Sequence, residues 1–139
     1  MMLKKIAVLL LIASFFSCHK AQEQAACGTQ ACTDIFAQIG VSFADINGSP
    51  VTVTGFSAIN QRTKVSVVPV SPTGGPASPG YYIVTDDNSK KEFSTEGDEV
   101  LISGTLSTTG QTKTVTYKIS GGCNCHVDKV SGSSTVVFD

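Results

Sequence analysis

The stretch that decides the fold reads Gly121-Gly122-Cys123-Asn124-Cys125-His126-Val127, near the end of a chain of 139 residues. It contains two of the five cysteines, and two more, Cys27 and Cys32, lie at the start of the part that we expect to fold. Matched cysteine pairs in an exported protein are typical of a disulfide framework, because disulfides persist in oxidising compartments. We therefore expect these four cysteines to close the domain on itself.

The spacing of the cysteines restricts which of them can bond. Cys123 and Cys125 are two residues apart, so on an extended strand they point the same way, with Cα atoms about 7 Å apart. That separation lies outside the comfortable range for a disulfide. Each should therefore reach across to Cys27 or Cys32. We favour Cys27 with Cys123 and Cys32 with Cys125, and the swapped pairing stays open.

The same stretch is the one place where the sequence could hold a metal. Cys123, Cys125 and His126 place two thiols and an imidazole within four residues, and zinc or copper accepts both kinds of ligand. On a strand, however, His126 points to the face opposite the two cysteines. An oxidising compartment also consumes free thiols. We expect no metal or other cofactor, and keep a zinc or copper site as the alternative hypothesis.

The beginning of the chain predicts export. Lys4 and Lys5 precede the apolar run from Ile6 to Ile12, which is typical of a secretion signal and too short to span a bilayer. The run leads through Ala13-Ser14-Phe15-Phe16-Ser17 into Cys18. A small residue directly before a cysteine at this point resembles the lipobox of bacterial lipoproteins, although the two phenylalanines are bulkier than usual there.

The resemblance to lipoproteins implies a covalent lipid anchor. It implies that the signal, residues 1–17, is removed and that Cys18 is acylated. Residues 18–31 would then form a lipidated flexible tether, and residues 32–139 the folded domain. By the sorting rule of that family, the absence of Asp at position 19 implies the outer membrane, with the periplasmic or surface face left open.

From Cys32 onward the sequence predicts an all-β domain. Strand-forming residues alternate with turn residues every 8 to 12 positions, as is typical of a sandwich or barrel. We expect a β-sandwich of about seven to nine strands. The expected strands lie near residues 35–43, 51–54, 64–70, 81–85, 90–94, 100–106, 115–119, 127–130 and 135–138, the last two forming a closing hairpin.

Two stretches predict the connections between strands. Asn47-Gly48 is typical of a tight hairpin turn in which both central residues have positive φ. Residues 71–80 contain three prolines and three glycines, which cannot pair within a central strand. We expect this second stretch to be a surface loop available for contact with a partner.

A second resemblance concerns the domain. Asp45-Ile46-Asn47-Gly48-Ser49-Pro50-Val51 looks like the opening hairpin of carboxypeptidase regulatory-like, transthyretin-type domains. Residues 85–93 loosely resemble their later turn and strand, although Ser89 stands where a glycine is usual. The resemblance covers about a third of the chain. It implies an immunoglobulin-like or transthyretin-like Greek-key sandwich without catalytic residues of its own.

Charge and composition exclude several functions. The net charge of −1 offers no basic surface for nucleic acid, and the lack of tryptophan weakens any stacking platform. His126 is the sole histidine outside the expected tether, and the acids Asp86, Asp87, Glu96, Asp98 and Glu99 lie in turn-like stretches where solvated surface is the expectation. We therefore predict a non-enzyme: a membrane-anchored binding or structural module with an unidentified protein or glycan partner.

Overall fold

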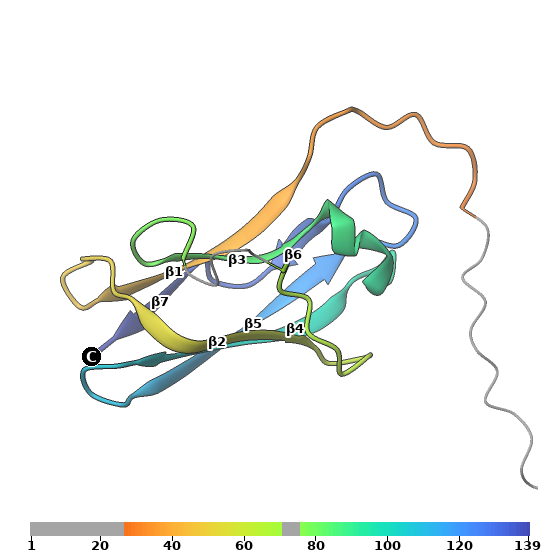
Figure 1. The fold of residues 1–139 in the computed structure, drawn as a ribbon. Coiled ribbons are helices and arrows are strands. Elements are labelled where there is room, and N and C mark those ends of the chain that lie inside the picture. The colour runs from red at the N-terminus through yellow and green to blue at the C-terminus, as the bar shows by residue number, and fades with distance from the viewer. Residues whose placement is uncertain (1–26, 71–75) are drawn as a thin grey trace, which may run out of the picture.

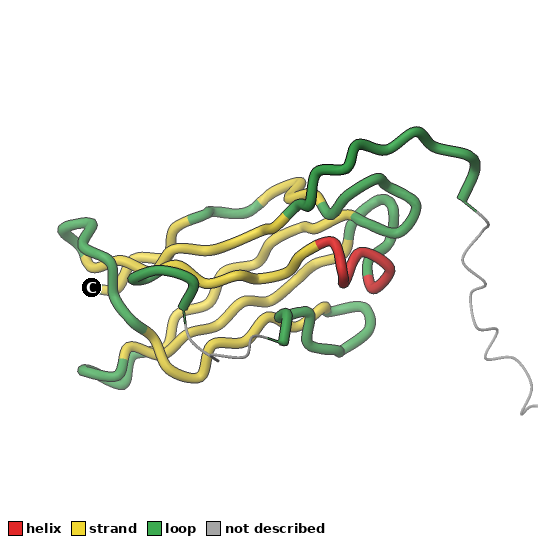
Figure 2. The backbone as a smooth tube through the Cα atoms, turned by 45° about the horizontal axis from the view of Figure 1, so that its top comes forward, coloured by secondary structure: helices red, strands yellow, loops and turns green. Residues whose placement is uncertain are grey.

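The computed structural model describes residues 27–70 and 76–139. The expected signal, Cys18 and most of the expected tether lie outside the described residues, as does half of the 71–80 loop. The described chain forms two packed β-sheets with the connecting loops gathered at the two ends (Figures 1 and 2). The predicted all-β sandwich is therefore confirmed. In this part of the chain, no helix has the length and apolar character needed to cross a membrane.

The smaller sheet has three strands, with β1 in the middle. β1 pairs antiparallel with β3 and parallel with β7, so the end of the chain lies beside its first strand. The bounds are β1 (Gln38–Asp45), β3 (Tyr81–Asp86) and β7 (Thr135–Phe138).

The larger sheet has four antiparallel strands in the order β2, β4, β5 and β6. A short 3-10 helix, η2 (Asp87–Glu92), connects the end of β3 toward this sheet. The bounds are β2 (Val53–Asn60), β4 (Asp98–Leu106), β5 (Thr112–Ser120) and β6 (Asp128–Ser131). The described residues thus contain seven strands, at the lower end of the predicted range.

The core lies between the two sheets and follows the alternation that the sequence shows. On β1 the inward residues Ile39, Val41 and Phe43 are buried, as their spacing of two predicts. The Phe43 ring packs against the rings of Phe56, Tyr82 and Phe138. This cluster joins the two sheets, and it joins the first strand, β1, to the last, β7. Ile35, which the alternation also included, precedes the strand and is 69% exposed.

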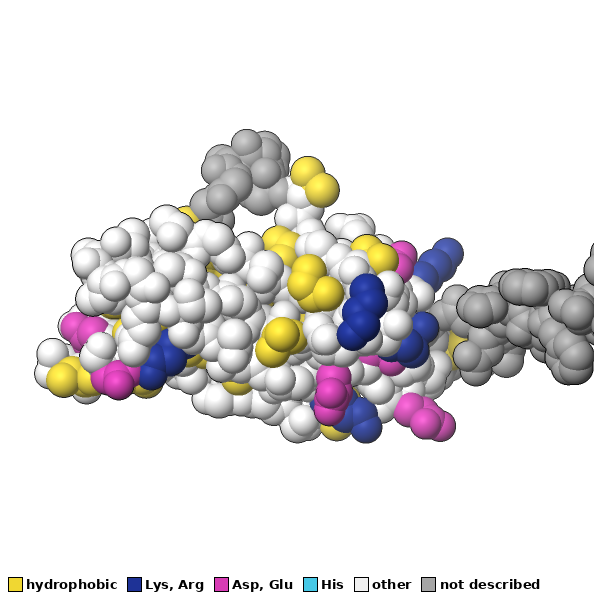
Figure 3. All heavy atoms as spheres, turned by 90° about the horizontal axis from the view of Figure 1, so that it is seen from below, with side chains coloured by type: hydrophobic (Ala, Val, Ile, Leu, Met, Phe, Trp, Pro, Cys, Tyr) yellow, Lys and Arg dark blue, Asp and Glu magenta, His cyan; other side chains and the backbone are white. Residues whose placement is uncertain are grey.

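The outer face of the larger sheet is rich in hydroxyl side chains. Facing positions of β4 and β5 pair Thr105 with Thr112 and Ser103 with Thr114. Threonine suits an exposed strand position because its branched side chain fits a pleated surface. Seen from below, charged side chains gather toward the two ends of the molecule and most of the area between is uncharged (Figure 3).

Two predicted strands are wrong. Residues 64–70 contribute only a single bridge, between Ser66 and Ile59. The reason is local, because Lys64 has a φ of 62°, which no strand adopts, and Pro69 cannot donate to a ladder. Residues 90–94 fall mostly in η2, because the carboxylate of Asp86 accepts the N–H of Asn88 and starts a helical turn.

The predicted closing hairpin is also wrong, although both of its strands form. β6 pairs with β5 in the larger sheet, whereas β7 pairs with β1 in the smaller one. Between them Gly132 has a φ of 117°, and the chain passes from one sheet to the other. Burial accounts for this arrangement, because Val136 and Phe138 of β7 lie in the core.

The turn after β1 differs in type from the prediction. Gly48 has the positive φ of 81°, but Asn47 is not among the described residues with positive φ. Instead, Oδ1 of Asp45 accepts the N–H groups of Asn47 and Ser49 and holds the turn in place. Val51 still donates to the carbonyl of Phe43, after which the chain crosses to the larger sheet.

Candidate functional site: the disulfide-clamped end

Two disulfides fasten the N-terminal residues to the loop between β5 and β6. Cys27 bonds to Cys123 and Cys32 bonds to Cys125, with Cα atoms 5.2 and 5.3 Å apart. This is the pairing that the sequence favoured. We call residues 27–37 the strap. The strap includes residues 27–31, which the sequence assigned to the tether, and here that stretch is bonded to the sandwich.

The loop that carries Cys123 and Cys125 docks against η2 and the residues that follow it. A Cβ added to Gly121 would lie 2.5 Å from the carbonyl oxygen of Lys90, so only glycine allows this approach. Gly122 donates its N–H to the same carbonyl at 2.8 Å and has a φ of 58°. Gly121-Gly122 therefore provides close contact and the backbone turn that presents the cysteines to the strap.

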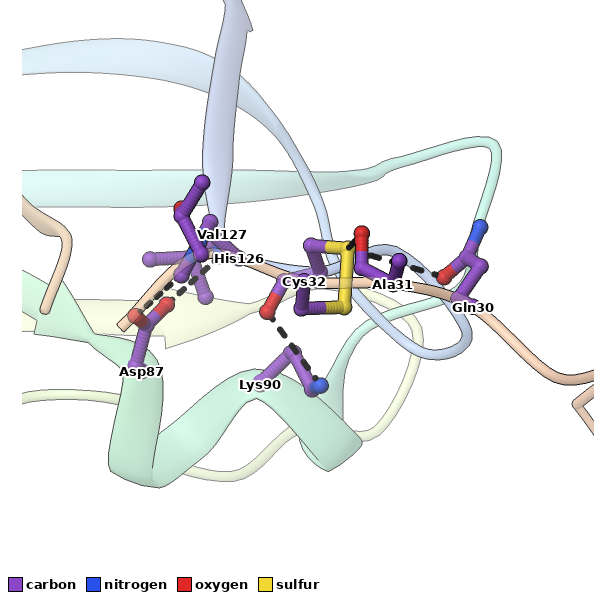
Figure 4. The surroundings of a disulfide bond; sticks show 9 residues. Gln30, Ala31, Cys32, Asp87, Lys90, His126 and Val127 are labelled. Carbon is purple, nitrogen blue, oxygen red and sulfur yellow. Dashed lines mark hydrogen bonds and ion pairs between the residues drawn. A yellow bond between two sulfur atoms is a disulfide. The ribbon is translucent and has the colours of Figure 1, made fainter. Parts of the chain in front are cut away.

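Asp87, the first residue of η2, joins three segments. Its Oδ2 accepts the N–H of Ala37 in the strap, and its Oδ1 accepts the N–H of Val127, both at 2.8 Å. Nδ1 of His126 lies 2.7 Å from Oδ2 (Figure 4). Burial raises the pKa of Asp87, but the bonds from Ala37, Val127 and His126 outweigh it, so the net pKa lies below its ordinary value.

The second disulfide brings the neighbours of its cysteines together. Thr33 follows Cys32, His126 follows Cys125, and Oγ1 of Thr33 lies 3.1 Å from Nε2 of His126. Both ring nitrogens of the histidine are therefore occupied, one by the strap and one by η2. Lys90 adds a bond from its ammonium group to the carbonyl of Cys125 (Figure 4).

The hydroxyl, imidazole and carboxylate stand in the order that activates nucleophiles in hydrolases. Acyl transfer also needs a substrate site and donors for the developing oxyanion. Thr33 is an exposed residue of the strap, and its hydroxyl is bonded to Nε2 of His126. What the arrangement does in the folded chain is to connect the strap to η2 and to the cysteine loop.

The structure does not assemble the ligand set of the metal hypothesis. Cys123 and Cys125 are consumed by disulfides with Cys27 and Cys32, so neither offers a thiolate. His126 is bonded to Asp87 and Thr33. Within residues 27–70 and 76–139, no group of three or more His, Cys, Asp or Glu side chains is placed to hold a metal ion.

Three acids that the sequence assigned to solvated turns are engaged in the fold. Asp87 forms the junction just described, and Asp86 and Asp98 are buried, with exposed fractions of 5% and 7%. The correction could have been anticipated for Asp98. It stands two and four residues before the core residues Val100 and Ile102, so the alternation of β4 directs it inward. Glu96 and Glu99 are exposed as expected.

Asp98 is the centre of a polar network that the sequence reasoning missed. Its two carboxylate oxygens accept bonds from the guanidinium of Arg62 at 2.8 and 2.9 Å. Asn60 and Ser94 donate to the same carboxylate. Burial raises the pKa of Asp98, but the bonds from Arg62, Asn60 and Ser94 outweigh it and hold the pKa far below its ordinary value. This network fixes the end of β2 to the start of β4.

A scan against protein-family models, a search of curated proteins and a search of solved structures each found no match.

Proposed function

We propose that this chain is a membrane-anchored envelope lipoprotein whose β-sandwich serves as a non-catalytic binding or structural module. The observation that carries the proposal is the placement of the two disulfides at the N-terminal strap. Disulfides persist in the oxidising compartments that exported proteins reach. The sequence before the strap has the charged start, the apolar run and the cysteine of a lipoprotein signal.

The strap gives the anchor a mechanical role. A pull from a lipid on Cys18 enters the folded domain at Cys27, which is bonded to Cys123, rather than at the first strand. The load then passes into the loop between β5 and β6 and spares the β1 ladder. Nine residues of chain from Cys18 to Cys27 extend to at most about 30 Å. The sandwich would therefore stay within about one domain diameter of the membrane.

The second role of the clamped end is support. The bond from Thr33 to His126 adds a non-covalent link between the strap and the cysteine loop, and the bond from His126 to Asp87 continues that link to η2. A rigid base of this kind leaves the loops at the opposite end of the sandwich to contact a protein or glycan partner. We assign no reaction to the chain.

The anchor is tested by detergent phase partition of the native chain and of the Cys18→Ser variant, both expressed with the complete signal. The native chain is expected in the detergent phase, with acyl groups on its N-terminal peptide in the mass spectrum. The variant is expected in the aqueous phase with its disulfides retained. Recovery of both chains in the aqueous phase, without acyl groups, would reject the lipoprotein assignment and leave the sandwich without a membrane role.

A further inference from the structure

A pocket of about 700 Å³ is lined by residues of β2 and β3, each of which lies at the edge of its sheet. This volume falls within the range of small-molecule sites, roughly 300 to 1,000 Å³. Val53, Phe56 and Val68 line it from the side of the larger sheet, and Tyr82 lines it from the smaller one. The walls are therefore mainly apolar.

The aromatic wall of the pocket is held in place by hydrogen bonds between the sheets. The Tyr82 hydroxyl donates to the carbonyl of Val53 at 3.0 Å and accepts the N–H of the same residue at 2.9 Å. The ring of Phe56 lies with its centroid 4.8 Å from that of Tyr82, at an interplanar angle of 33°. The two rings thus pack against each other on a wall formed by β2 and β3, with Tyr82 itself only 5% exposed.

A buried acid, Asp86, is among the residues that line the pocket. Asp86 lines the pocket together with Gln38, its partner across the β1–β3 ladder. Only 5% of Asp86 is exposed, and its Oδ1 accepts the N–H of Asn88. The ion pairs within the described ranges use Asp87, Asp98 and Asp139. In this part of the chain, therefore, Asp86 has no cationic partner, an unfavourable arrangement for a buried carboxylate.

We propose that the pocket binds a small organic cation, with its ammonium group beside Asp86 and its apolar body against Phe56 and Tyr82. Charge complementarity selects the cation, because an ammonium group supplies the countercharge that Asp86 lacks. The apolar lining residues add to the selection by favouring an apolar body next to the ammonium group. The proposed site does not depend on the lipid anchor or on the disulfide-clamped end.

Binding is tested by two-dimensional NMR of the full-length chain with its disulfides intact, titrated with three probes of similar size. They are 2-phenylethylamine, which is a cation at neutral pH, the neutral 2-phenylethanol, and the anionic 3-phenylpropanoate. We expect the amine to shift signals of Gln38, Phe56 and Tyr82, with an affinity roughly tenfold above that of the alcohol. The anion should shift none of them. Equal affinities for amine and alcohol, or shifts confined to other residues, would overturn the proposal.

The variants Asp86→Asn and Asp128→Asn separate the carboxylate from general charge effects. Asn keeps an oxygen for the N–H of Asn88, so the turn into η2 retains its acceptor. In Asp86→Asn the amine should bind roughly tenfold more weakly and the alcohol equally well. Asp128 lies exposed on β6, at the edge of the larger sheet opposite β2, and its variant should bind like the native chain. Unchanged amine binding in Asp86→Asn would contradict the proposal, and the three-probe comparison decides it if that variant fails to fold.

Discussion

Asp87 and His126, 39 residues apart in the sequence, are joined by a 2.7 Å contact between Oδ2 and Nδ1. The same carboxylate receives the N–H groups of Ala37 and Val127. One side chain at the start of η2 therefore connects the strap, the cysteine loop and the end of β3. The disulfides and this carboxylate act on the same junction by different chemistry, one covalent and the other by hydrogen bonds.

Replacing Asp87 by Asn should weaken the junction without changing its volume. The amide group can accept at one atom only, so at least one of the N–H groups of Ala37 and Val127 loses its partner. We expect the free energy of unfolding to fall by about 2 kcal/mol, the usual cost of an unsatisfied buried donor. Urea denaturation measures this change in the free energy of unfolding. The matched variant Asp128→Asn, at an exposed position, should change stability by less than about 0.5 kcal/mol, and equal effects of the two variants would contradict the assignment.

The two disulfides should stabilise the fold in a non-additive way. Either one alone closes a loop of more than ninety residues, with sequence separations of 96 and 93. In the chain-entropy model, a disulfide that closes such a loop raises the free energy of unfolding by about 4.7 kcal/mol. Once one bond exists, the second closes only a ring of about nine residues, formed by residues 27–32 and 123–125. By the same model, closing this small ring adds about 2.5 kcal/mol to the free energy of unfolding.

Removing one disulfide should therefore cost about 2.5 kcal/mol and removing both about 7 kcal/mol. The paired variants are Cys27→Ser with Cys123→Ser, Cys32→Ser with Cys125→Ser, and all four together. Urea denaturation of the oxidised proteins compares them. The loss in the free energy of unfolding of the quadruple variant should exceed the sum of the losses of the two paired variants. A loss no larger than that sum would contradict the arrangement in which both disulfides close the same long loop.

Stability should decline in acid partly through Asp98. The pKa of Asp98 is lowered in the folded chain, whereas an unfolded Asp titrates near a pH of about 3.9. Its contribution is therefore fully present above a pH of about 4 and is lost as the pH falls toward the folded pKa. The stability difference between the native chain and Asp98→Asn should shrink below a pH of about 4.

Urea midpoints measured across a series of pH values check this dependence. The control is Glu99→Gln, because Glu99 is the next residue on β4 and is exposed. That variant should show a small difference from the native chain at every pH. A difference for Asp98→Asn that stays constant down to a pH of about 2 would show that the carboxylate is not held by Arg62, Asn60 and Ser94 in solution.

Tyr82→Phe should loosen the contact between the edges of β2 and β3. The variant keeps the ring but leaves both the N–H and the carbonyl of Val53 without the phenol, at a cost of about 1–3 kcal/mol. Tyr81→Phe is the matched control on the same strand, since no hydrogen bond of its hydroxyl occurs within the described residues. Thermal unfolding compares the two, and the account predicts the larger fall in melting temperature for Tyr82→Phe.

Local patterns predicted the features that depend on local geometry. The alternation of Ile39, Val41 and Phe43 identified the inward face of β1 because a strand has a period of two. The two-residue spacing of Cys123 and Cys125 argued against a bond between them and left the observed pairing and its swap open, with the observed pairing favoured. In the same way, the alternation of Asp98 with Val100 and Ile102 along β4 indicates that Asp98 points inward.

The features that the sequence did not predict depend on the whole fold. Whether β7 joins β6 or β1 is decided by where Val136 and Phe138 find the core, which no short window contains. The contact of Asp87 with His126 requires the cysteine loop to dock against η2, as it does where Gly122 donates to the carbonyl of Lys90. The pocket at Asp86 arises because two edge strands from different sheets meet, and neither strand alone shows it.

The most direct test of the account is a map of the disulfides in the mature chain. Unreduced peptides should be fragmented by electron transfer, because Cys123 and Cys125 are too close to be separated reliably by proteolysis. We expect bonds from Cys27 to Cys123 and from Cys32 to Cys125, with no free thiol. The swapped pairing, or free thiols at Cys123 and Cys125, would contradict the clamp that joins the two ends of the domain.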